Sequence, residues 1–270
     1  KLASFVTGRK KVIAFTGAFH GRTSLAVAAT DNPKIVAPVN ATENIVFVPF
    51  NDIAAFLKVM DAEVAAVIVE GIQGVGGIQI PSADFLETIQ ANCKEFGAKL
   101  ILDEVQSGYG RTGRFFAHQH FNVEPDIITT AKGMGNGFPV AGVLIAPDIK
   151  PTYGMLGTTF GGGYLACAAS IAVLDVMEQE NLMANAQKMG DYILSKLQGI
   201  SGIKEIRALG LMIGVDMEKP AGPLRNALVF DHKVFTGAAG AHTVRLLPAL
   251  NITQKEADEF IDAFKKAIEA

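Results

Sequence analysis

Short runs of apolar, often β-branched residues alternate with helical stretches over the first 180 residues, and this alternation constrains the fold more than any other feature of the sequence. It is typical of an α/β protein in which a mostly parallel sheet is covered by helices on both faces. Ligands of such sheets bind at the carboxyl ends of the strands, so we expect the functional residues there. The predicted strands are Lys11–Thr16, Ile45–Pro49, Val64–Glu70, Leu100–Val105, Ile127–Thr130 and Ala141–Ala146, and the predicted helices are Asp52–Met60, Ser82–Phe96 and Ala166–Glu180.

The pattern changes after about residue 176, which predicts a second, smaller domain. A long amphipathic stretch, Glu180–Gln198, is followed by three short segments and a closing helix. We expect a large domain over residues 1–175, and a connecting helix with a small α+β domain over residues 176–270. Residues 1–8 resemble the last turns of a helix that ends at a glycine, with no N-cap and no initiator methionine, so we expect the N-terminal part of the large domain to be absent. The short segments are Leu209–Met217, Val234–Gly237 and Thr243–Leu247, and the closing helix is Thr253–Ala270.

Composition excludes several classes of protein. The formal net charge is −3, so there is no basic excess to bind nucleic acid. No run of 18 apolar residues is present, so we expect no membrane span. The two cysteines, Cys93 and Cys167, lie in predicted helices, which favours buried, reduced thiols in a cytoplasmic protein. We expect no metal site.

An acid and a lysine end two of the predicted strands. Asp103 follows three aliphatic residues, and a buried carboxylate is costly unless it is paired. Lys132 lies between an apolar strand and the glycine-rich loop 133–139, although lysine is rare in protein interiors. A desolvated lysine amine is a nucleophile that can form a Schiff base, and a nearby acid can keep a pyridine nitrogen protonated. Together they favour a site for pyridoxal phosphate, although in an arbitrary α/β protein an isolated Asp103 would more often cap a helix.

Two further segments could complete such a site. Residues 157–163 (GTTFGGG) precede the helix that begins near Tyr164, and hydroxyls with free amides at a helix N-terminus suit a phosphate. A flexible glycine turn is the alternative. Residues 19–22 (FHGR) follow the first predicted strand, where Phe19 could stack on a ring and Arg22 could bind a carboxylate. The alternatives are a core phenylalanine and a surface arginine.

The motifs taken together resemble the class III (ornithine-type) pyridoxal-phosphate-dependent aminotransferases, and most closely the members that act on acyl-ornithines. The resemblance implies the type I fold of pyridoxal phosphate enzymes, with a large domain around a mostly parallel sheet and a small C-terminal α+β domain. The matching stretches are AFHGRT (18–23), VEGIQG (69–74), LILDEVQSGYGRTG (100–113), PDIITTAKG (125–133), GTTFGG (157–162) and VRLLP (244–248).

The resemblance also implies roles for cofactor residues. Lys132 would hold pyridoxal 5'-phosphate as a covalent aldimine, and Asp103 would pair with the pyridine nitrogen. Val105 would pack on the ring face opposite Phe19, and Gln106 would bond to the ring hydroxyl. The implied cofactor contacts are Phe19, Asp103, Glu104, Val105, Gln106, Lys132 and Thr159.

Substrate contacts and the oligomer are implied in the same way. Arg22 and Thr158 would contact substrate, with Arg22 on a carboxylate, and Glu70 would order Arg22 or Gln106. Arg245 would receive the α-carboxylate of 2-oxoglutarate. Thr159 would bind the phosphate of the cofactor in the neighbouring subunit, so a homodimer with a shared active site is expected.

The expected reaction moves the ω-amino group of N-acetylornithine or N-succinylornithine to 2-oxoglutarate, a step of arginine biosynthesis. The sequence leaves open another class III ω-aminotransferase, of ornithine or 4-aminobutyrate type, and a catalytically inert protein of the same fold. A nucleotide-binding oxidoreductase is disfavoured, because the glycines of residues 133–137 have the wrong spacing and lead into Phe138 and Pro139 rather than a helix.

Overall fold

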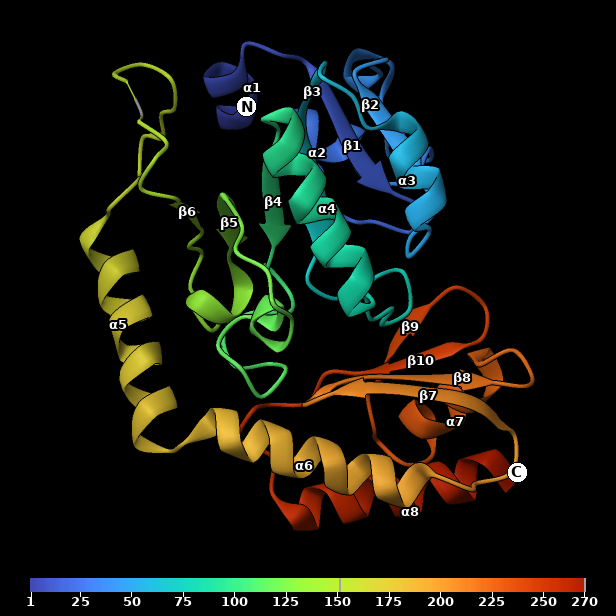
Figure 1. Ribbon diagram of the computed structural model, residues 1–270. Coiled ribbons are helices and arrows are strands. Elements are labelled where there is room, and N and C mark those ends of the chain that lie inside the picture. Colours follow the sequence, from blue (N-terminus) through green and yellow to red (C-terminus); the bar gives the residue numbers. More distant parts are fainter. Residues whose placement is uncertain (151, 270) are drawn as a thin grey trace. The chain divides into compact units, whose positions relative to one another are not determined.

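The computed structural model describes residues 1–150 and 152–269, which form two compact units (Figure 1). The first unit comprises residues 1–72, 81–108 and 117–174. The second comprises residues 73–80, 109–116 and 175–270. Two short segments, 73–80 and 109–116, thus interrupt the first unit in sequence but belong to the second. No pattern in the sequence predicted this assignment.

A six-stranded sheet forms the centre of the first unit, in the order β2-β1-β3-β4-β5-β6. All neighbouring strands pair in parallel except β5 and β6, which are antiparallel. The predicted mostly parallel sheet is therefore confirmed, and β4 ends at Asp103 rather than Val105. The strands are β1 (Lys11–Phe15), β2 (Ile45–Val48), β3 (Val64–Glu70), β4 (Lys99–Asp103), β5 (Ile127–Thr130) and β6 (Gly142–Ile145).

Helix α4 (Ala83–Phe96) crosses the sheet and buries its apolar side (Figure 1). Its N-terminus is capped by Ser82, whose hydroxyl accepts a hydrogen bond from the amide of Phe85 at 3.2 Å. Gly97 ends it in the left-handed conformation, with φ 66°. Phe85 packs edge to face on Phe15 of β1, which fixes the start of the helix to this strand. The other helices that begin in this unit are α1 (Leu2–Thr7), α2 (Ser24–Ala28), α3 (Ile53–Val59) and α5 (Tyr164–Gln179).

The second unit is a four-stranded antiparallel sheet in the order β7-β8-β10-β9, with helices packed on one face. Three predictions here need correction. The turn at Gly210–Leu211 divides the predicted segment 209–217, so β8 begins at Met212. Strand β7 and helix α7 were not predicted, because β7 carries charged residues and α7 begins with Gly222 and Pro223, which resemble a turn. Strand β9 begins only at Gly237, the last residue of the predicted segment 234–237. The elements are α6 (Leu182–Leu197), β7 (Ile203–Leu209), β8 (Met212–Met217), α7 (Gly222–Phe230), β9 (Gly237–Ala239), β10 (Thr243–Leu246) and α8 (Gln254–Glu269).

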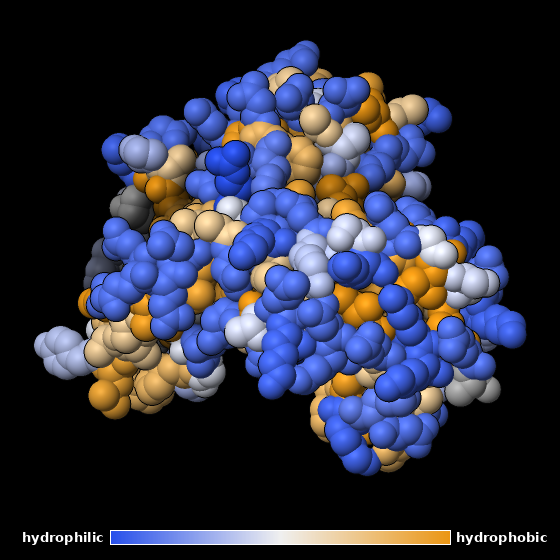
Figure 2. Space-filling view, turned by 90° about the horizontal axis from the view of Figure 1, so that it is seen from below, coloured by the Kyte–Doolittle hydropathy of each residue, from blue (hydrophilic) through white to orange (hydrophobic). Residues whose placement is uncertain are grey.

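Large apolar side chains are exposed along α5 and the segment before it. Figure 2 shows hydrophobic colour at the left edge of the view, where Figure 1 places α5. Cys167 of α5 is also exposed, so the expectation that both cysteines are buried is wrong for this residue. None of the helices in the described part of the chain is long and apolar enough to cross a membrane. The exposed apolar residues include Leu156 and Phe160 before α5, Tyr164, Leu165, Ile171, Leu174 and Val176 on α5, and Val143 and Leu144 on β6.

Candidate active site

The carboxyl ends of three neighbouring strands bring acidic and basic residues to one edge of the large sheet. Asp103 is the last residue of β4, and its register partners are Glu70 at the end of β3 and Thr129 of β5. Lys132 follows two residues after β5 ends. Because parallel strands end at the same edge, residues from distant parts of the sequence gather there.

Asp103 is held by a histidine that the sequence patterns did not single out. Nδ1 of His20 lies 2.8 Å from Oδ2 of Asp103, and the amide of Val105 donates to Oδ1 at 3.1 Å. The side chains of His20 and Asp103 are only 2% and 8% exposed. A buried carboxylate needs such donors, because desolvation otherwise penalises its charge. The signal that could have identified His20 was its place between Phe19 and Gly21 in the AFHGRT motif.

The loop after β1 is tied to the same edge. The amide of Phe19 donates to Oε1 of the buried Glu70 at 2.9 Å, and the amide of His20 donates to the hydroxyl of Thr30 at 2.9 Å. Glu70 therefore holds the start of the segment that carries Phe19 and His20. Arg22, two residues further on, is exposed.

The carboxylate of Glu104 is engaged by the protein itself. It accepts hydrogen bonds from the hydroxyl of Ser107, the amide of Ala117, and the amide and Nδ1 of His118, at 2.5–3.0 Å. Its backbone amide also donates to the carbonyl of Thr129 of β5 at 2.9 Å. Glu104 thus shapes the turn that carries Asp103 and fixes this turn to β5, rather than offering its carboxylate to a ligand.

Lys132 adopts a φ of 44°, in the left-handed region that residues other than glycine rarely occupy. Strained backbone of this kind is found disproportionately at functional sites. The residue is exposed, as is most of the loop 133–139 that follows. The expectation of a desolvated lysine is therefore wrong for this chain by itself, because the glycine-rich loop does not cover the amine.

The remaining predicted residues are spread more widely. Val105 and Gln106 are half-buried beside Asp103, and Oε1 of Gln106 is a buried acceptor without a hydrogen-bond partner among the described residues. Thr158 and Thr159 are exposed in the segment before α5. Arg245 belongs to β10 of the second unit.

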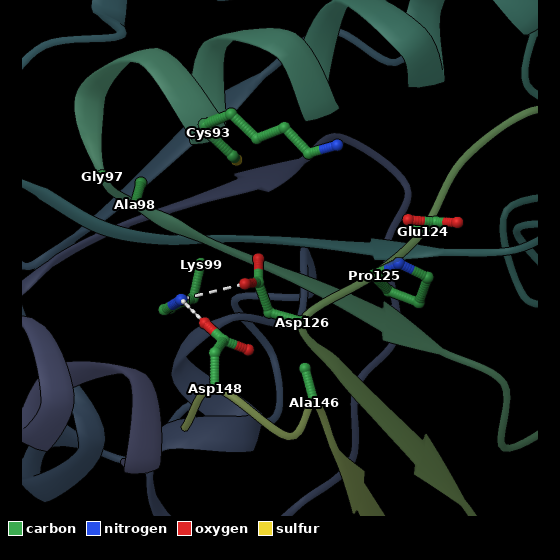
Figure 3. Close-up of a pocket in the computed structure, with 10 residues that line it drawn as sticks. Cys93, Gly97, Ala98, Lys99, Glu124, Pro125, Asp126, Ala146 and Asp148 are labelled. Carbon is green, nitrogen blue, oxygen red and sulfur yellow. Dashed lines mark hydrogen bonds and ion pairs between the residues drawn. The ribbon is translucent and has the colours of Figure 1, made fainter. Parts of the chain in front are cut away.

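A hollow of about 380 Å³ lies at the opposite, amino end of the same strands (Figure 3). Three of its charged residues pair with one another, since Nζ of Lys99 lies 2.9 Å from Asp126 and 3.3 Å from Asp148. The thiol of Cys93 also lines it, and desolvation raises the pKa of this thiol to about 12, so it stays protonated and unreactive. We therefore assign this cluster a structural role.

Comparison with known proteins agrees with the fold. The class-III aminotransferase family model matches residues 1–268. The acetylornithine aminotransferase of Methanosarcina mazei is 37% identical over 273 aligned residues, which cover 99% of this chain and 68% of that protein. The acetylornithine aminotransferase of Bacillus subtilis is 39% identical over an alignment that covers 99% of this chain and 71% of that protein.

Solved structures show the same architecture. An ornithine aminotransferase from Toxoplasma gondii, whose structure has partial occupancy of pyridoxal phosphate in its active site, superposes with a TM-score of 0.88 at 30% identity, covering 98% of this chain and 67% of that one. An S-selective transaminase from Arthrobacter superposes with a TM-score of 0.92 at 26% identity, over 99% and 71% of the two chains.

The fold and the family match identify a transferase of amino groups. The chain belongs to the class-III aminotransferases. Membership implies pyridoxal phosphate, and the residues at the carboxyl edge fit this group. Asp103 offers a buried carboxylate for a pyridine N–H, and the amide of Gln106 has a buried atom that the described residues leave without a partner. Lys132 offers an amine at the end of the adjacent strand.

Proposed function

We propose that this aminotransferase transfers the ω-amino group of N-acetylornithine to 2-oxoglutarate in the cytoplasm, giving glutamate and the acyl-glutamate semialdehyde. One observation carries the proposal: Asp103, paired with His20, ends β4, while Lys132 follows the adjacent strand β5. The substrate follows from the relatives, because several of the most similar proteins are named acetylornithine aminotransferases. N-succinylornithine is the alternative acyl substrate.

Pyridoxal phosphate, when bound, supplies an electrophilic carbon for amines and a ring that withdraws electrons. Lys132 would hold it covalently through Nζ and then move the proton at the substrate carbon that loses its amino group. Asp103 would keep the pyridine nitrogen protonated, and His20 would hold the Asp103 carboxylate in its orientation. Phe19 and Val105 would sandwich the ring, and Gln106 would bond to its hydroxyl.

Substrate contacts come from three further positions. Arg22 would bind a substrate carboxylate beside Thr158, and Arg245 would bind the α-carboxylate of 2-oxoglutarate through the charged fork of its guanidinium. Glu70 supports this side of the site through the amide of Phe19.

We propose a homodimer in which Thr159 of one subunit binds the phosphate of the cofactor held by the other. The exposed apolar residues on β6, on α5 and before it support this, because contiguous apolar surface of this kind marks interfaces. Ile171 and Leu165 of α5 are 58% and 76% exposed. Sedimentation of the protein and of Ile171→Glu tests the proposal: a dimer that the substitution dissociates supports it, and a monomeric protein contradicts it.

Addition of pyridoxal phosphate tests the cofactor and its lysine. We expect an absorbance band near the edge of the visible range, which borohydride converts to a stable adduct on Lys132. Lys132→Ala should lack the band, while Lys150→Ala, a surface control, should keep it. A band fixed elsewhere contradicts the assignment. The ratio of kcat/KM for N-acetylornithine to that for N-succinylornithine, ornithine and 4-aminobutyrate then identifies the amino donor, and a preference for either of the last two contradicts the proposed substrate class.

A further inference from the structure

Two arginines of the small sheet lie in one cross-strand row. Arg207 of β7 and Arg245 of β10 are both register partners of Gly214 on β8, and Arg245 is also opposite Gly237 of β9. Directly opposed residues on antiparallel strands point to the same face of a sheet. The neighbours of Gly214 in β8, Ile213 and Val215, pack into the helix-covered core. Both arginines therefore project from the face opposite the helices.

The turn formed by residues 73–79 covers this row. Its ends pair through two backbone hydrogen bonds between Gln73 and Gln79, of 3.0 and 3.1 Å. A side chain at Gly214 would place a Cβ 2.9 Å from Cβ of Ile78 and 3.0 Å from the carbonyl oxygen of Gly77. The turn can thus lie against the sheet only because glycine occupies the middle of the row.

Arg207 clamps one end of the turn. Its Nε donates to the carbonyls of Gly77 and Ile78, each at 3.2 Å, and its Nη2 donates to Gly77 at 2.9 Å. Ile78 is fully buried at a φ of 55°, a conformation that is costly for a β-branched residue and persists only where the surroundings impose it. The Arg207 clamp is one of the contacts that impose it.

Asp216 fixes Arg207 in turn. Its two oxygens each accept from a terminal nitrogen of Arg207 at 2.8 Å, and Oδ1 also accepts from the hydroxyl of Thr243 at 2.6 Å. This bidentate pair leaves the guanidinium one orientation, in which Nε and Nη2 donate to the turn. Lysine could not reproduce the arrangement, because it lacks the planar fork.

The other end of the turn holds Arg245, since the carbonyl of Gly74 accepts from its Nη1 at 3.0 Å. We propose that Arg207, oriented by Asp216, is a positioning residue for Arg245: by fixing the turn, it sets where the Gly74 carbonyl holds the guanidinium that captures the oxo acid. The inference rests on the proposed function, in which Arg245 binds the carboxylate of 2-oxoglutarate. It predicts an effect on one substrate alone.

The test separates the two halves of the reaction. For Arg207→Lys we expect the KM for 2-oxoglutarate to rise about tenfold, the effect of misplacing one charged hydrogen bond. The single-turnover rate with the amino donor should stay within about twofold, because no contact to the donor changes. Glu205→Gln is the matched control: its carboxylate is 2.9 Å from Nη1 of Arg207 but 55% exposed, so the KM should not move.

Arg245→Gln, measured in parallel, tests the role of Arg245 separately from the positioning role of Arg207. If it leaves the KM for 2-oxoglutarate unchanged, the proposed role of Arg245 is wrong. If it raises the KM while Arg207→Lys does not, the positioning inference is wrong. Equal losses in both half-reactions for Arg207→Lys also overturn the inference, since they indicate a general structural defect. Should Arg207→Lys fail to fold, Gly214→Ala displaces the same turn without altering either arginine, and the same selective rise in KM is expected.

Discussion

The imidazole of His20 lies 2.8 Å from the carboxylate of Asp103. His20 lies in the loop after β1 and Asp103 ends β4, so the two residues are 83 positions apart in the sequence. The pair is buried, so the carboxylate depends on its protein donors rather than on water. In the proposed site for pyridoxal phosphate, this pair holds the Asp103 carboxylate in one orientation, with the imidazole bound to one of its two oxygens.

Replacing His20 by alanine should weaken catalysis without unfolding the protein. Loss of one partner of a buried charged hydrogen bond costs about 1–3 kcal/mol, which corresponds to a roughly tenfold or greater fall in kcat and in affinity for pyridoxal phosphate. Cofactor titration and steady-state kinetics measure both. His232→Ala, in the second unit, is the control and should leave both values unchanged; equal effects of the two substitutions would contradict the role of His20.

Asp103→Asn should nearly abolish transamination, because a neutral amide cannot stabilise a protonated pyridine nitrogen. We expect kcat to fall by at least about a hundredfold, in line with the loss of a group that acts on proton distribution in the transition state. Asp126→Asn, at the opposite end of the strands, should keep kcat and lose only a little stability, because its partner Lys99 is partly solvated. A fully active Asp103→Asn variant would contradict the proposed role of Asp103.

Gly71→Ala should destabilise the first unit. The added Cβ would lie 2.9 Å from both Cβ of Ala117 and Oε1 of Glu104, so the Glu104 cluster must shift. Overpacking of this kind costs about 1–3 kcal/mol. Urea unfolding followed by circular dichroism measures the change. Gly222→Ala, where the new methyl group meets no atom within 4 Å, should leave the midpoint nearly unchanged. Equal midpoints for the two variants would show that the contacts around Gly71 are unimportant.

Acid should loosen the clamp on the 73–79 turn. Hydrogen bonds from Arg207 and Thr243 hold the pKa of Asp216 below its ordinary value of 3.8, against the effect of desolvation. Ionised Asp216 therefore stabilises the folded state above pH 3.8, and this contribution is lost as the pH falls through the lower, folded-state pKa. Asp216→Asn should lower stability at neutral pH, and its difference from the parent should shrink below pH 3.8. The exposed Asp262→Asn should show no such convergence, and a pH-independent difference for Asp216→Asn would contradict the assignment.

Much of the first unit could be predicted from sequence, because periodicity is a local signal. Apolar runs such as Val64–Glu70 are typical of buried strands. A serine before an amphipathic stretch, such as Ser82, indicates the start of a helix. The second unit was harder. Strand β7 lies at the edge of a small sheet and contains two adjacent charged residues, Lys204 and Glu205, which interrupt the alternation typical of a strand; pairing with β8 makes it a strand.

The sequence by itself determined the α/β class, the acid and the lysine at successive strand ends, and the motifs that place the chain among class-III aminotransferases. Tertiary structure decided which side chains meet. The pairing of His20 with Asp103 joins segments 83 residues apart, and the row of Arg207, Gly214 and Arg245 lies beneath a turn more than 120 residues earlier in the chain. Local patterns carry no record of such contacts, because strand register and packing across the sheet fix them only when the chain has folded.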